Sequence, residues 1–134
     1  MSLVLVDTNV LVDVLTGDPE WGEWSSEMLA RCFDEGRVGI NPIIYAEVSV
    51  AYDRLEDLDQ ALSPSSFQRL DLPWEAAFLA GKAFRAYRRR GGARRTPLPD
   101  FYIGAHAAVA GLPLLTRDTA RYATYFPRVK VIGP

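Results

Sequence analysis

Four acidic side chains occupy positions where a carboxylate could help to bind a metal ion. Asp7 directly follows a short apolar run, Asp100 precedes an alanine-rich segment, and Asp118 comes shortly after an apolar pair. Glu47 lies among apolar residues with helical spacing, and a glutamate is rarely buried unless it is paired or bound to a metal. Two carboxylates about 4 Å apart repel each other by roughly 4 kcal/mol at an effective dielectric constant of about 20. A cluster of these acids therefore predicts a bound cation.

The residue types favour a hard divalent ion at such a cluster. Oxygen ligands without histidine or cysteine select Mg²⁺ or Mn²⁺ rather than zinc. These ions can activate a water molecule and stabilise the charge that develops on a phosphate, which is the chemistry of phosphodiester hydrolysis. Cys32 is the only cysteine, so the chain can form neither an internal disulfide nor a zinc site built from several thiolates.

Each acid also has a simpler interpretation when it is taken alone. Asp7, Asp100 and Asp118 each precede a predicted helix and could cap it. Glu47 could pair with an arginine, although it lies on the side of its helix that we expect to be buried. That expected buried stripe consists of Ile44, Val48, Ala51 and Leu55.

Strands and helices alternate along the predicted chain. Apolar runs predict strands at Leu3–Val6, Val38–Ile40, Leu114–Leu115 and Val129–Ile132. Capping residues, prolines and glycines delimit helices from Asp7 to Gly17, Pro19 to Gly36, Asn41 to about Leu55, Trp74 to Arg90, Asp100 to Gly111 and Thr119 to Tyr125. The segment 56–73 is interpreted as a short piece of helix, a turn and an irregular crossing. Pro97 and Pro99 are expected to stiffen the basic loop that begins at Gly91.

This alternation predicts an α/β fold with a central parallel sheet of four or five short strands and helices on both faces, in a single domain over residues 1–134. Ligands of such sheets bind beyond the carboxyl ends of the strands. Asp7 and Asp118 both follow strands, so we expect them at the same edge of the sheet.

The composition is that of an ordinary globular domain, with 49% hydrophobic and 24% charged residues among 134. Asp7 interrupts the first apolar run, which lacks a basic leader and a cleavage site, and no apolar stretch is long enough to span a bilayer. We therefore expect a cytoplasmic protein without a membrane partner. The net charge is −2, yet arginines crowd into the segment 85–95, where the simplest interpretation is a solvated helix end.

Four segments resemble, in order, the motifs of PIN-domain nucleases: Leu3–Asn9, the helical Glu47, Asp100–Ala107 and Leu114–Asp118. The resemblance covers nearly the whole chain, whose length and ending look like those of VapC-type toxins of toxin–antitoxin pairs. It implies a PIN-like three-layer domain and an endoribonuclease that depends on Mg²⁺ or Mn²⁺.

The resemblance also assigns roles to residues. It makes Asp7, Glu47, Asp100 and Asp118 both the catalytic and the metal-binding residues, with Thr8, Asn9 and Thr116 as supporting polar residues. It implies an RNA substrate, a small antitoxin that covers the site, and a homodimer. In this context we expect the arginines to contact the RNA backbone; they are Arg88, Arg89, Arg90, Arg94 and Arg95.

Two other functions remain open from the sequence. One is a catalytically silent PIN-like module that only binds RNA or a protein. The other is a phosphatase resembling the haloacid dehalogenases, whose motif needs a second aspartate where this chain has Asn9. Of the remaining candidates, His106 is expected to be structural or exposed, and Asp13 a surface acid or a support for the site. Trp21, Trp24 and Trp74 could supply surfaces for the antitoxin or the dimer, but we expect most of these three residues to pack in the core.

Overall fold

The computed structural model describes residues 2–95 and 98–134 and contains a five-stranded parallel sheet with the strand order β3-β2-β1-β4-β5. The strands are β1 (Ser2–Val6), β2 (Gly36–Ile40), β3 (Phe67–Arg69), β4 (Leu114–Leu115) and β5 (Val131–Ile132). The helices are α1 (Thr8–Thr16), α2 (Gly22–Glu35), α3 (Pro42–Ser49), α4 (Leu55–Ala61), α5 (Trp74–Arg89), α6 (Pro99–Ala110) and α7 (Thr119–Tyr125).

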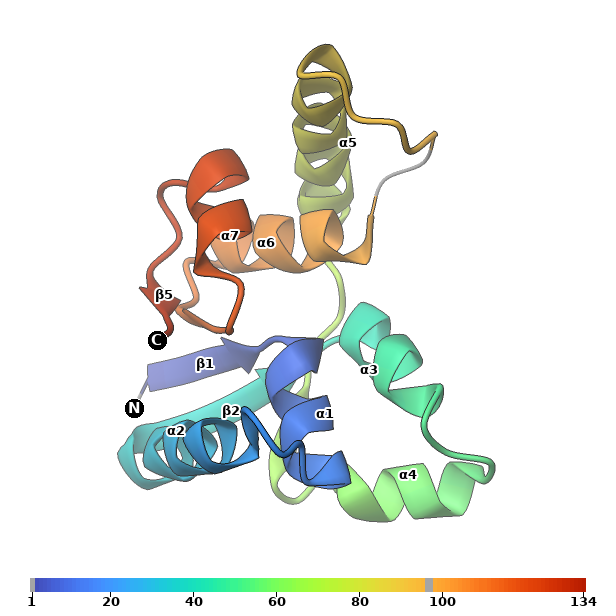
Figure 1. The fold of residues 1–134 in the computed structure, drawn as a ribbon, viewed down its shortest axis with the longest axis vertical. Coiled ribbons are helices and arrows are strands. Elements are labelled where there is room, and N and C mark those ends of the chain that lie inside the picture. The colour runs from blue at the N-terminus through green and yellow to red at the C-terminus, as the bar shows by residue number, and fades with distance from the viewer. Residues whose placement is uncertain (1, 96–97) are drawn as a thin grey trace.

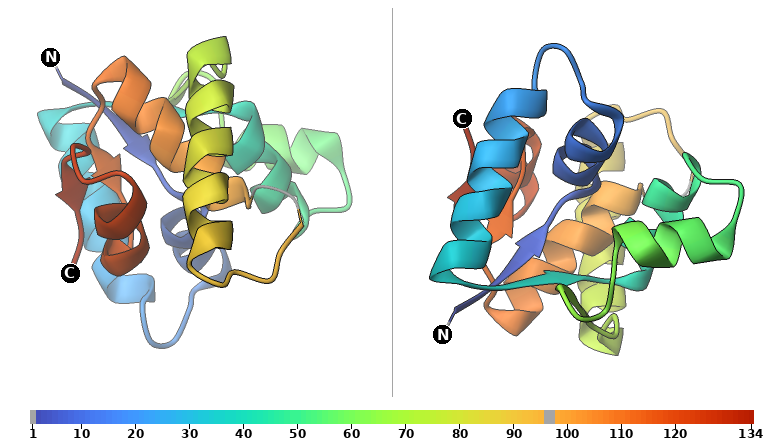
Figure 2. Two further views of the ribbon diagram at one scale, coloured as in Figure 1. Left: turned by 90° about the horizontal axis from the view of Figure 1, so that it is seen from above. Right: turned by 90° about the horizontal axis from the view of Figure 1, so that it is seen from below.

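The helices lie on both faces of the sheet. Helices α1 and α2 cover one face, and α6 lies on the other together with α5 and α7 (Figure 1 and Figure 2). The predicted three-layer α/β architecture is thus confirmed.

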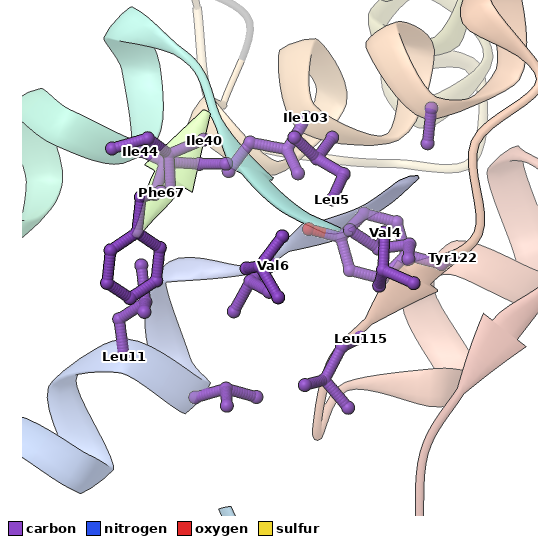
Figure 3. Packing of buried hydrophobic residues seen from close by; sticks show 14 of the residues in the cluster. Val4, Leu5, Val6, Leu11, Ile40, Ile44, Phe67, Ile103, Leu115 and Tyr122 are labelled. Atoms are coloured by element: carbon purple, nitrogen blue, oxygen red, sulfur yellow. The ribbon is translucent and has the colours of Figure 1, made fainter. Parts of the chain in front are cut away.

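The central strand β1 is buried on both faces. Leu5 points towards Ile103 of α6, whereas Val6 points to the opposite side, towards Leu11 of α1 (Figure 3). All four side chains are at most 1% exposed. Because successive residues of a strand face opposite sides, a strand covered on both faces must be apolar throughout, and this explains the uninterrupted run from Leu3 to Val6.

Two predicted caps start helices at the carboxyl edge of the sheet. Asp7 has an extended backbone, and its side chain accepts a hydrogen bond from the Thr8 amide at 2.8 Å. Asn41 follows β2 and accepts one from the Ile44 amide at 2.9 Å, with Pro42 as the first residue of α3. These caps turn the chain sharply, so Asp7 remains beside the end of β1.

Two helix boundaries were predicted wrongly. Helix α2 begins at Gly22 and not at Pro19, because the Asp18 carboxylate accepts hydrogen bonds from the Glu20 and Trp21 amides and forms a turn there. Helix α3 ends at Ser49, well before Leu55. The amides of the three residues after Ser49 donate hydrogen bonds to carbonyl groups three positions earlier, and this tighter turn ends the helix.

The strand β3 was not predicted, and its residues were interpreted as an irregular crossing. It has three residues and pairs with β2 in the register Val38 to Phe67, so neither its length nor its apolar content marks it as a strand. Pro99 is the first residue of α6 and not part of the loop, β5 begins at Val131, and Pro97 lies outside the described residues. In the described ranges no helix is long and apolar enough to cross a membrane.

Gly104 lets α6 and α7 approach closely, and its replacement by alanine is expected to destabilise the protein. An added Cβ would overlap ring atoms of Phe126 and lie 3.0 Å from the Tyr122 ring. Overpacking of this kind lowers the free energy of unfolding by roughly 1–3 kcal/mol. At Gly81 of α5 no atom lies within 4 Å of an added Cβ. Because glycine is less favourable than alanine within a helix, Gly81→Ala should raise the free energy of unfolding by up to about 1 kcal/mol. Urea denaturation of both variants checks this, and equal effects would contradict the packing argument.

Candidate active site

The four predicted acids come from four different parts of the fold. Asp7 directly follows β1 and caps α1, Asp118 caps α7, Asp100 lies in the first turn of α6, and Glu47 lies in the last turn of α3. The negative charge of Asp100 raises the pKa values of Asp7 and Glu47, and the charge of Asp118 raises the pKa of Asp100. The acids therefore lie close enough to repel one another.

Asp7 is held by four hydrogen-bond donors. Its Oδ2 atom accepts from the Thr116 hydroxyl at 2.7 Å, the Tyr122 hydroxyl at 3.0 Å and the Asn9 amide group at 3.3 Å. Its Oδ1 atom accepts from the backbone amide of Thr8. The side chain is only 3% exposed. These donors fix the orientation of the carboxylate, and three of them are the predicted supporting residues.

Glu47 is half-buried, and its Oε1 atom accepts a 2.6 Å hydrogen bond from the Thr8 hydroxyl. Thr8 thus contacts two of the acids, one through its backbone and one through its side chain. Ile44 and Val48 are buried as predicted, but Ala51 and Leu55 are exposed. The predicted stripe was wrong at these two positions because α3 ends at Ser49 and does not carry them.

Burial makes ionisation of these acids unfavourable. It is the largest cause that raises the pKa of Asp7 from its usual 3.8 to about 6, and hydrogen bonds from Thr116 and Tyr122 oppose the shift. Burial also raises the pKa values of Glu47 and Asp100. These desolvated acids also repel one another, so a bound cation would stabilise their ionised forms.

Arg121 supplies part of the positive charge at this site. Its Nη1 atom lies 3.1 Å from Oδ2 of Asp100, and its Nε atom lies 3.7 Å from Oδ2 of Asp118. Over residues 2–95 and 98–134, no three acidic, histidine or cysteine side chains converge as a ready ligand set. The donor chemistry fits a hard divalent ion, and ligation by Asp100 and Asp118 together would require these side chains to turn away from Arg121.

Arg121→Gln is expected to strengthen Mn²⁺ binding. The arginine competes with the metal for two carboxylates, and partly exposed ion pairs of this kind contribute up to about 1 kcal/mol, or roughly fivefold in affinity. Titration calorimetry with Mn²⁺ measures the effect. Arg128→Gln removes the same charge from an exposed position and serves as the control. Equal affinities in the two variants would rule out the competition.

An ion pair that the sequence did not reveal fixes the loop between Thr116 and Asp118. Arg117 donates to both carboxylate oxygens of Asp13, at 2.6 and 2.9 Å, and the Ser25 hydroxyl donates to the same carboxylate at 2.7 Å. Asp13 is 2% exposed, which excludes the surface alternative and agrees with the alternative of a support for the site. The pair joins α1 and α2 to the loop after β4, and thereby positions two residues of the site.

Tyr122 and Arg121 are the other two contacts that sequence analysis missed. Tyr122 is fully buried, and burial and the nearby charges of Asp7 and Asp100 raise its pKa. It therefore stays a neutral phenol and donates a hydrogen bond to Asp7. Both residues follow Asp118 by three or four positions, which places them on one side of the helix that Asp118 caps. That spacing was the available signal.

The remaining candidates lie outside the acidic group. His106 is buried, with Nδ1 2.9 Å from Nδ2 of Asn41, and burial lowers its pKa, which agrees with the structural alternative. Trp74, the first residue of α5, is 90% exposed and lies outside the core, whereas Trp24 is partly buried and packs against the core. The predicted RNA-binding arginines are exposed; they are Arg88, Arg89, Arg90, Arg94 and Arg95.

The sequence matches the family model of the PIN domain over residues 4–127. The chain belongs to the PIN domain family. No curated protein matches the sequence.

Solved structures have the same fold over nearly their whole length. They include a toxin–antitoxin complex from Klebsiella pneumoniae, with 24% identity, 98% of this chain and 97% of that chain covered, and a TM-score of 0.72. FitAcB from Neisseria gonorrhoeae has 24% identity, coverage of 98% and 97%, and a TM-score of 0.70. VapBC2 from Rickettsia felis, bound to a DNA fragment of the promoter, has 18% identity, coverage of 98% and 98%, and a TM-score of 0.70.

Proposed function

We propose that this protein is a metal-dependent endoribonuclease that uses Asp7, Glu47, Asp100 and Asp118 to bind Mg²⁺ or Mn²⁺. The observation that carries the proposal is the buried Asp7 carboxylate. It is held by four donors at the carboxyl edge of the sheet and is coupled to Asp100. Membership of the PIN domain family supports it.

In this proposal the chain's own residues hold the acids in place. Thr116, Asn9 and Tyr122 orient Asp7, and Thr8 orients Glu47 through its hydroxyl. Bound Mg²⁺ or Mn²⁺ would supply an activated water and would stabilise negative charge on the phosphate. Ligation of the ion by Asp100 and Asp118 would free the Arg121 guanidinium from these acids, and it could then donate to a phosphate oxygen.

The exposed arginines of the segment 88–95 contact the RNA backbone in this proposal. An acidic site needs a positive surface beside it to attract a polyanion, and phosphate contacts make affinity depend on salt. Arg90 lies over the Tyr125 ring, 5.6 Å from its centre, and Tyr125 ends the helix that Asp118 caps. Arg90 therefore lies beside α7, whose other end carries Asp118.

The solved structures with this fold come from toxin–antitoxin complexes, which supports the toxin of such a pair as the biological role. The partners would be a small antitoxin protein and a second copy of this chain, and the protein would act in the cytoplasm on cellular RNA. Induced expression of the wild type should stop bacterial growth, and expression of Asp100→Asn should not. Normal growth with the wild type at high expression would contradict the toxin role.

Cleavage of RNA by the purified protein tests the enzymatic proposal. A labelled structured RNA and DNA of the same sequence are incubated with Mg²⁺ or Mn²⁺, and in parallel with a chelator. We expect the RNA to be cut only when the metal is present. RNA that is bound but never cut would favour the catalytically silent module. The phosphatase alternative has no support, since the chain belongs to the PIN domain family.

A further inference from the structure

A pocket of about 380 Å³ opens beside the acidic group, between α5, α6 and α7. It shares Asp118 and Arg121 with that group, and Ala120 and Thr124 line it as well. Its size falls in the range of small-ligand sites, roughly 300–1,000 Å³. None of the roles given above to Asp118 and Arg121 requires such a space.

Aromatic rings form the remaining walls of this pocket. Phe101 is buried, and its ring centre lies 5.6 Å from that of Tyr87 and 5.2 Å from that of Tyr125, in edge-to-face contact with both. Tyr87 and Tyr125 are only partly buried. The contacts with Phe101 hold the two tyrosines in fixed orientations, so a ligand would meet preformed aromatic surfaces.

Two arginines lie beside the same rings. The Arg90 guanidinium lies over the Tyr125 ring, and Arg121 belongs to the pocket wall. The pocket therefore suits a flat aromatic group that carries negative charge beside it. An unpaired nucleotide has this combination, since its base can stack on an aromatic side chain while its phosphate pairs with arginine.

We propose that the pocket binds an unpaired nucleobase adjacent to the phosphate that is cut, with the Tyr125 ring as its stacking surface. The proposal rests on the proposed ribonuclease function and assigns to the pocket beside Tyr125 the recognition of one base. A base in the pocket places its own phosphate beside Arg121 and the acids, because Arg121 and Asp118 belong to both sites.

The test compares two effects on RNA affinity, that of removing one base from the RNA and that of removing the Tyr125 ring from the protein. The probe is a fluorescent RNA hairpin with a single-stranded loop, made in versions with an abasic nucleotide at each loop position in turn. Binding is followed by anisotropy in the Asp7→Asn protein, so that the RNA stays intact. We expect one abasic position to weaken binding roughly tenfold, as the loss of one base stack does. Tyr125→Leu should weaken binding of intact RNA equally, and that abasic position should then have no further effect.

Two further variants keep the test independent of folding defects. Tyr125→Phe retains the ring and should bind as tightly as the parent, whereas Ala120→Trp should block the pocket from an exposed position. Phe78→Leu removes an exposed ring elsewhere on α5 and should change nothing. Thermal melting confirms that each variant is folded.

The outcomes separate this proposal from the ribonuclease function. If the wild type cuts the hairpin but Tyr125→Leu and Ala120→Trp both keep the full sensitivity to the abasic position, the pocket proposal is wrong and the ribonuclease function stands. If the wild type neither cuts nor binds any of the hairpins, both are wrong. If the abasic position and Tyr125→Leu weaken RNA binding equally and the wild type cuts the hairpin, both the pocket proposal and the ribonuclease function are supported.

Discussion

Replacing Asp7 by asparagine is expected to stop RNA cleavage and also to make the metal-free protein more stable at neutral pH. The substitution removes a proposed metal ligand, and the loss of a group acting directly in catalysis lowers the rate at least about a hundredfold. The same substitution removes a charge that is 3% exposed and repelled by Asp100. A gain in stability together with a loss of activity distinguishes a functional acid from a structural one.

The sign of the pH dependence follows from the raised pKa of Asp7. The folded protein releases this proton near pH 6, whereas the unfolded chain releases it near 3.8, so the folded state binds the proton more tightly. Ionisation therefore destabilises the fold progressively as the pH rises from about 4 to 6, by about 3 kcal/mol at most. Above pH 6 the ionised Asp7 destabilises the folded state by the full amount, and below pH 4 this destabilisation is absent.

Thermal melting of the wild type and Asp7→Asn across this pH range checks the effect. The midpoint of the variant should exceed that of the wild type at neutral pH, and the difference should disappear near pH 4. Mn²⁺ should stabilise the wild type and not the variant, since a ligand stabilises the state that binds it. Asp34→Asn, on the exposed side of α2, is the control. A variant that is less stable than the wild type at neutral pH would contradict this account of Asp7.

Arg117→Ala is expected to lower the free energy of unfolding by about 3–5 kcal/mol, because it leaves the buried Asp13 carboxylate without its charged partner. The Asp13 side chain is 3% exposed and that of Arg117 29%. The loop that carries Thr116 and Asp118 would lose its attachment to α1, so cleavage should fall as well.

The exposed pair of Arg69 and Asp59 provides a matched comparison. Its side chains are 45% and 40% exposed at a separation of 2.7 Å, and solvent screens such exposed pairs so that they contribute little to stability. Urea denaturation of Arg117→Ala and Arg69→Ala should therefore give clearly different losses. The double variant Asp13→Ala with Arg117→Ala should lose less than the sum of its single variants. Similar losses for the two arginine variants would contradict a buried, coupled pair.

The sequence predicted the parts of the fold that local rules determine. The run Leu3–Val6 is apolar because β1 is buried on both faces, and Asp7 and Asn41 cap helices because the chain must turn at the sheet edge. Parallel strands bring their carboxyl ends to one edge, so the proximity of Asp7 and Asp118 could be expected from two short motifs.

The contacts between distant segments could not be predicted in this way. Strand β3 exists because β2 offers it a partner, and Asp13 and Arg117 meet although 104 positions separate them. Neither pairing leaves a periodic pattern in the sequence. Trp74 shows the converse, since its residue type favours the core and only the tertiary structure reveals that it is exposed.

The most direct test of the central claim measures Mn²⁺ binding and RNA cleavage in the same preparations of the wild type and Asp100→Asn, with Asp34→Asn as the control. The account predicts that the wild type and the control bind Mn²⁺ and cut RNA only with metal, while Asp100→Asn loses both properties and remains folded. Cleavage by Asp100→Asn at the wild-type rate, or cleavage that a chelator does not stop, would contradict it.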